Sequence, residues 1–95
     1  MSYEYTVPAG YAEEEINEVI DESIASRLEF AQRRLATYQA SCAAFEQQYG
    51  MSTQEFLDKF ESGTVGDQQE WFDWYAAAEG KKLWSRKCDI LVHLV

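Results

Sequence analysis

The side chains best suited to catalysis in this sequence are one histidine, His93, and two cysteines, Cys42 and Cys88. Acid–base and nucleophilic enzymes hold such groups in a pocket beside a partner that activates them. His93 lies close to the end of the sequence, where chains are often loosely held. Both cysteines fall on apolar stripes, and burial in apolar surroundings raises the pKa of a thiol and leaves it inert. We therefore predict no catalytic residue and a protein that is not an enzyme.

Carboxylates near the start of the sequence are candidates for binding Ca²⁺ or Mg²⁺, because both ions prefer oxygen ligands. Glu14, Glu18, Asp21 and Glu22 share one face of an expected helix. A calcium cage needs about six to eight oxygens, and a di-metal helical centre needs Glu-x-x-His; neither pattern is present in the sequence. The cysteines and histidine are too few and too far apart for zinc. We predict a solvated acidic face, no metal site and no cofactor.

Charge is distributed unevenly along the chain, which has a formal net charge of −9. Residues 1–22 hold seven acids and no Lys or Arg. Nucleic-acid binding depends on Lys and Arg displacing counterions from phosphates, so direct binding of DNA or RNA is not expected. The one basic cluster is Lys81, Lys82, Arg86 and Lys87. It either binds nucleic acid or, as we favour, complements the dipole at the end of a helix.

The composition indicates a single folded domain. The chain has 95 residues, 46% of them hydrophobic and 26% charged, which is typical of globular proteins. Nothing at the start resembles a secretory signal, and reduced cysteines are expected in a cytoplasm. No apolar run approaches the roughly 18–20 residues of a membrane-spanning helix. We therefore expect a cytoplasmic protein that does not insert into membranes.

Apolar residues recur at spacings of three and four from Ile16 to Tyr49, which is the period of one helix face. From Leu28 onward the spacing alternates as in the a/d seam of a coiled coil, so this face should pack on another helix. Gly50 supplies the left-handed conformation that commonly ends a helix. We predict one long helix over about 12–49.

A short helix over about 53–62 is predicted by two local signals at its start. Ser52 and Glu55 have the spacing of a capping box, and Met51 can pack across the first turn against Phe56.

A third helix is predicted over about 67–92, with Asp67 as its cap and Glu70 as the capping partner. Large apolar residues surround the helix at 71–75, and a single antiparallel neighbour covers only one side of it, so something else should dock on the remainder. Residues 1–11 form an N-terminal arm whose pattern suits an extended segment and a frayed tail equally.

These elements predict an all-α fold in one domain, 12–95, with a long, a short and a long helix arranged as an antiparallel hairpin. The first helix would be about 57 Å long and the third about 39 Å, whereas a compact chain of this length has a radius of gyration of about 12 Å. The hairpin cannot cover its own first helix, so we predict a homo-oligomer, a dimeric bundle, or a complex with another protein. The expected interface residues are Ile16, Ile20, Ile24, Leu28, Leu35, Trp71, Trp74 and Trp84.

The segment 49–91 contains the strings YGMS, EFLDKFESG and GD followed by EWFDW. In these it resembles small helical proteins of archaea and cyanobacteria that are encoded beside a small toxin-like protein and act as its antitoxin-like partner. The resemblance implies a non-enzymatic inhibitor of a basic partner protein. Steering toward that partner would come from the acids Glu13, Glu14, Glu18, Asp21 and Glu22.

Two classes of function therefore remain after sequence analysis. The first is a self-associating protein-interaction module with an antitoxin-like role, and the second is a structural or scaffolding oligomer without an inhibitory role. A metal-dependent enzyme using the acidic face and a DNA-binding regulator using the basic cluster are weaker alternatives.

Overall fold

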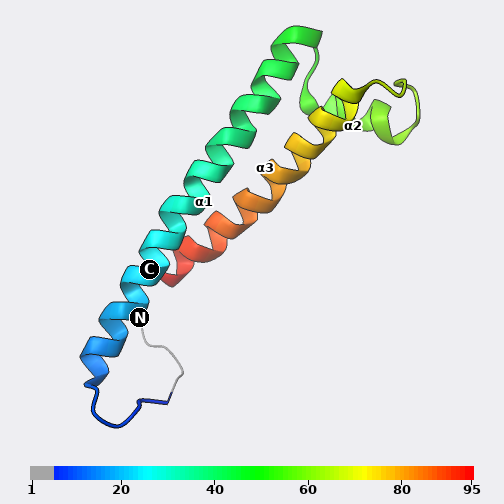
Figure 1. Ribbon diagram of the computed structural model, residues 1–95. Coiled ribbons are helices and arrows are strands. Elements are labelled where there is room, and N and C mark those ends of the chain that lie inside the picture. The colour runs from blue at the N-terminus through cyan, green and yellow to red at the C-terminus, as the bar shows by residue number, and fades with distance from the viewer. Residues whose placement is uncertain (1–5) are drawn as a thin grey trace.

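The computed structural model describes residues 6–95 and has three helices in this part of the chain: α1 (Glu13–Tyr49), α2 (Thr53–Glu61) and α3 (Gln69–Leu94). The predicted all-α class and the order of long, short and long helices are confirmed. Figure 1 shows that α3 returns antiparallel to α1, with α2 beside the start of α3. Of the predicted arm, residues 1–5 lie outside the described part, and residues 6–11 precede α1 without helical structure.

The boundary between α1 and α2 forms as the local sequence predicts. Gly50 has a left-handed backbone, with φ of 66°, and its N–H donates to the Glu46 carbonyl at 2.9 Å. The Ser52 hydroxyl then accepts a hydrogen bond of 3.1 Å from the Glu55 N–H, which satisfies one of the unpaired donors at the start of α2. These two caps turn the chain through a corner of three residues between the helices.

The prediction for the start of α3 is wrong by two residues. Gln68, not Asp67, is the residue before the first helical turn, and its side chain makes no capping hydrogen bond. At its other end α3 continues to Leu94, so the basic cluster at 81–87 lies inside the helix and His93 is the only basic residue of the last turn. The helix-dipole effect fades beyond the last turn, and the capping interpretation of the basic cluster is therefore wrong.

The core lies at the closed end of the hairpin, where all three helices meet. Trp74 and Phe56 are fully buried, and their rings stack with centroids 4.1 Å apart and planes 2° apart. Helix α2 also covers the side of α3 that α1 leaves open, because Phe60 stacks on Tyr75 with centroids 4.6 Å apart. Sequence analysis predicted that another molecule covers the open side of residues 71–75, and α2 supplies part of that cover.

The rest of the molecule is an elongated two-helix rod. Its extents are 61 × 21 × 20 Å and its radius of gyration is 19.4 Å, against about 12 Å for a compact chain of this length. In Figure 1 the end of α3 (red) lies against the cyan section of α1, and the blue start of α1 extends beyond it. The predicted mismatch in length between α1 and α3 is therefore present.

Candidate protein-binding site

The start of α1 projects past the end of α3, and we call this section, residues 13–24, the overhang. The last turns of α3 reach α1 near Arg27, which lines one hollow with Lys87, Ile90 and Leu91. Beyond that point the apolar face of α1 continues without α3. The predicted interface residues of the overhang, Ile16, Ile20 and Ile24, are half-buried.

The remaining predicted interface residues lie within the chain's own helix packing. Leu28 and Leu35 are half-buried on the same face of α1 as the buried Ala31. Trp71 packs against the core at the closed end. Trp74 was expected at an interface with another protein, but its side chain is 0% exposed. That expectation is wrong, because the corner between α1 and α2 brings Phe56 over its ring.

Trp84 is half-buried and is surrounded by cations from both long helices. The Arg27 guanidinium lies 5.5 Å from its ring centroid, the Arg34 guanidinium 5.7 Å and the Lys87 ammonium 4.6 Å. Cations over an indole face are attracted by its quadrupole. Trp84 therefore joins α1 to α3 inside one chain and is not a free anchor for a partner.

Acidic and basic side chains are separated along the rod. The overhang carries six acids and no Lys or Arg, and the predicted steering residues Glu13, Glu14, Glu18, Asp21 and Glu22 are all exposed. Seven of the eight Lys and Arg residues instead belong to the middle of the hairpin, on α1 and α3: Arg27, Arg33, Arg34, Lys81, Lys82, Arg86 and Lys87.

A hollow on α1 spans the border between these acidic and basic sections, and we call it the Ser23 hollow. It is lined by Val19, Glu22, Ser23, Ser26, Arg27, Phe30 and Arg33. Its two large apolar side chains are open to solvent, since Val19 is 62% exposed and Phe30 is 38% exposed. Sequence reasoning missed this face because the seam facing α3 has the stronger periodicity. The signal in the sequence was the spacing of Val19 and Phe30, which is about three helical turns and therefore places both on the same face of the helix.

Next to it, a second hollow lies under the overhang. Pro8 and Tyr11, from the segment before α1, line it together with Glu15, Ile16, Val19 and Ile20. The chain turns at Gly10, where φ is 93°, so residues before the helix return toward the helix. Val19 borders both hollows. The second hollow, which includes Ile16, Val19 and Ile20, forms an apolar strip on the overhang.

The best-connected polar cluster serves the fold. The Thr53 N–H donates to Glu46 Oε2 at 2.8 Å, and Trp74 Nε1 donates to the Thr53 hydroxyl at 3.1 Å. Hydrogen bonds from the Thr53 backbone and side chain hold the pKa of Glu46 below its ordinary value. Burial raises the pKa of the neighbouring Cys42 thiol. A carboxylate at the start of α2 favours the helix dipole, so this cluster fixes α2 in the corner.

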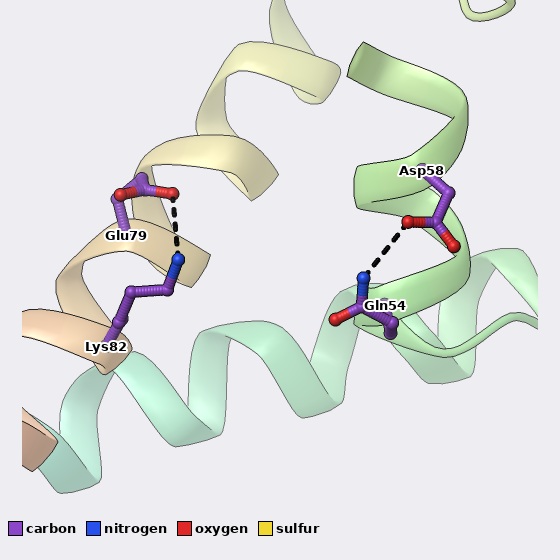
Figure 2. A network of polar contacts seen from close by, with 4 residues as sticks. All are labelled: Gln54, Asp58, Glu79 and Lys82. Atoms are coloured by element: carbon purple, nitrogen blue, oxygen red, sulfur yellow. Dashed lines mark hydrogen bonds and ion pairs between the residues drawn. The ribbon is translucent and has the colours of Figure 1, made fainter. Parts of the chain in front are cut away.

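The outer face of α3 carries an exposed apolar row that sequence reasoning also missed, formed by Phe72, Leu83 and Ile90. Beside this row Lys82 Nζ lies 4.0 Å from a Glu79 carboxylate oxygen. On α2, Gln54 Nε2 donates to Asp58 at 3.0 Å. Figure 2 shows that both contacts stay within their own helix, so neither ties α2 to α3.

Within residues 6–95, no group of three or more His, Cys, Asp or Glu side chains is placed to hold a metal ion. None of the helices described there combines the length and apolar character of a membrane span. Comparisons with protein-family models, with characterised proteins and with solved structures found no significant match to this chain.

Proposed function

We propose that this chain is a protein-interaction module that acts by binding and not by catalysis, and that the overhang is its binding surface. The observation that carries the proposal is the projection of α1 past the end of α3. An apolar strip containing Val19, Ile16 and Ile20 is left there without a second helix from the same chain. Helix faces of this kind commonly bind another helix or a groove.

The charge of the overhang selects the class of partner. Six acids and no cation along about three turns of helix attract a positively charged protein surface and raise the rate of encounter with it. The sharpest version of the proposal is an antitoxin-like inhibitor, in which the overhang covers the electropositive surface of a basic partner. The alternative is a structural oligomer in which the overhang meets another copy of the chain. A cytoplasmic location is part of the proposal, and it fits two cysteines that form no disulfide.

The proposal is tested by reversing charge on the overhang and recovering the tagged full chain from its host under gentle conditions. Wild-type protein should retain a companion, either a second copy or a basic protein, in fixed ratio. The variant with Glu14→Lys and Glu18→Lys should lose it. A matched control with Glu61→Lys and Asp67→Lys changes the net charge equally at the other end of the rod and should keep it.

Two results would contradict the proposal. A wild-type chain that is recovered alone and remains a monomer at every concentration binds no protein. Equal loss of the companion in both charge-reversed variants would show that net charge, and not the overhang, determines the association.

A further inference from the structure

The Ser23 hollow has a self-complementary layout along α1. Val19 and Phe30 lie at equal distances on either side of the midpoint between residues 24 and 25, and so do Glu22 and Arg27. We propose that this hollow pairs with the same hollow on a second copy of the chain, the two α1 helices running antiparallel about a two-fold axis through that midpoint. A two-fold contact uses the same patch on both subunits. The inference rests on the proposed function, because it names the partner of the overhang.

In this register apolar groups meet apolar groups and acids meet cations. Val19 of each copy faces Phe30 of the other, and Glu22 faces Arg27. Ser23 and Ser26 lie at the centre of the contact. Their small side chains allow the two helices to approach closely, because the distance between packed helices depends on the side chains at their contact. The pairing therefore covers the two most exposed apolar residues of the hollow, whose side chains are 62% and 38% exposed in the single chain.

The charge of the two halves of α1 supports the antiparallel direction. Residues 13–24 contain six acids and no Lys or Arg, whereas residues 25–36 contain three Arg and one acid. An antiparallel pair places each acidic half on the basic half of the other copy. A parallel pair would place the acidic halves side by side, where like charges repel. A second copy is thus a better occupant in the antiparallel register than in the parallel one.

The charged groups around the hollow have no ion-pair partner in the single chain. Within residues 6–95 the structure contains one ion pair, Lys82 with Glu79, so Glu22, Arg27 and Arg33 face one hollow without pairing. The Arg27 guanidinium is held at its edge, 4.7 Å from the centroid of the Phe30 ring. A group already ordered in this way loses less conformational freedom when a partner binds.

Only one edge of the hollow touches α3, where the Phe30 ring and the Arg27 guanidinium each lie 5.5 Å from the Trp84 ring centroid. The rest of the hollow faces away from α3. At about 100° per residue, the side of α1 that carries Val19 and Ser26 lies roughly a third of a turn from the side that carries the buried Ala31 and Cys42. A second α1 helix can therefore dock without displacing α3. The hairpin of each copy would remain intact and the two would form a four-helix arrangement around the paired α1 helices.

The first test is the mass of the purified full chain across a range of concentrations by sedimentation equilibrium. We expect a dimer that weakens when salt is raised to about 1 M, where the Debye length is about 3 Å. Glu22→Arg or Arg27→Glu alone should weaken the dimer by about tenfold or more, because Glu22 of one copy faces Arg27 of the other and either reversal places like charges together. Combining the two reversals should restore it. A monomer at all concentrations would overturn the inference, and so would a dimer that neither single reversal weakens.

Disulfide cross-linking tests the register separately. In the proposed pairing, position 26 of one copy is offset from position 26 of the other by about 4.5 Å along the helix, and position 19 by about 16 Å. Under mild oxidation Ser26→Cys should form a covalent dimer and Val19→Cys should not. Wild type is the control, because its Cys42 and Cys88 are buried. Equal cross-linking at both positions would indicate a parallel pair, and none at either would indicate a different interface; both results overturn the register.

These outcomes separate the inference from the proposed function. A chain that is monomeric alone but binds a basic protein through Glu14 and Glu18 would contradict the inference and support the proposed function. A chain that associates with no protein would contradict both.

Discussion

Gly80 of α3 lies directly against the ring of Tyr38 of α1: a methyl group on its Cα would be 2.6 Å from Tyr38 Cε1. The Tyr38 ring is held in place because its hydroxyl accepts a hydrogen bond of 2.8 Å from Arg34. Glycine inside a helix costs about 1 kcal/mol relative to alanine. At this position that cost is offset by the close approach of the two long helices.

Gly80→Ala should therefore destabilise the protein although alanine is the better helix former. Overpacking costs about 1–3 kcal/mol and the gain in helix propensity is about 1 kcal/mol, so we expect a net loss of about 1 kcal/mol in urea unfolding. Gly66→Ala is the matched control, because nothing lies within 4 Å of the added methyl group. With Tyr38→Ala in the background, Gly80→Ala should become neutral or stabilising. Destabilisation that persists without the ring would contradict the packing argument.

Thr53→Val should weaken the corner between α1 and α2. The substitution keeps the shape of the side chain but removes the hydroxyl that accepts from Trp74 Nε1. An unsatisfied buried donor costs about 1–3 kcal/mol, and unfolding by denaturant should show a loss in that range. Thr53→Ser retains the hydroxyl and should lose much less. Equal losses for the two variants would show that the methyl group, and not the hydrogen bond, is what matters.

Lowering the pH should remove the stabilisation that the ionised Glu46 carboxylate contributes to the folded state. Its pKa is below the ordinary value in the folded chain because Thr53 hydrogen bonds to the carboxylate. The folded state then binds fewer protons than the unfolded state as the unfolded carboxyl titrates, near a pH of about 4.3. The stabilisation is fully present above that pH and is lost as the pH falls through the lower, folded pKa.

The test is the free energy of unfolding from pH 7 downward for wild type and Glu46→Gln. Glu46→Gln should be less stable at neutral pH by about 1 kcal/mol, and the difference should shrink in acid. Glu29→Gln, at an exposed position, removes the same charge and should keep the wild-type profile. A gap between wild type and Glu46→Gln that stays constant with pH would rule out the carboxylate as the source.

The overhang and the core should respond differently to truncation of large side chains. Phe56 is 0% exposed, and Phe56→Ala should cost about 3–5 kcal/mol. Ile20 is half-buried beyond the end of α3, so Ile20→Ala should cost clearly less in unfolding experiments on dilute protein. Similar losses at the two positions would mean that the overhang belongs to the cooperative core and is not available for binding.

Short-range signals were sufficient for the helices themselves. Gly50 and Ser52 act on neighbouring backbone groups, so their roles could be predicted from residue type and spacing. The start of α3 was misplaced at Asp67 because two adjacent residues, Asp67 and Gln68, can both precede a helix. The backbone conformation that selects Gln68, with ψ of 142°, depends on how the loop closes between α2 and α3.

The candidate binding site was predictable only in part. The acids of the overhang and the excess length of α1 follow from the sequence. The packing of Trp74 and Trp84 inside the chain could not be predicted. A tryptophan on an apolar stripe has the same sequence pattern whether it packs inside the chain or against a partner. The Ser23 hollow was missed for the opposite reason, since Val19 and Phe30 do not belong to the strongest stripe.

The sequence by itself determined the all-α class, the ends of α1, the capping of α2 and the separation of acids from cations, because each depends on neighbours within about one or two helical turns or on composition alone. Only the tertiary structure decided that Phe56 closes over Trp74, that Tyr38 requires a glycine opposite it and that Val19 and Phe30 stay open. Those outcomes depend on the register between α1 and α3. Helical periodicity shows which face of each helix is apolar, but it does not show how far one helix is shifted along the other.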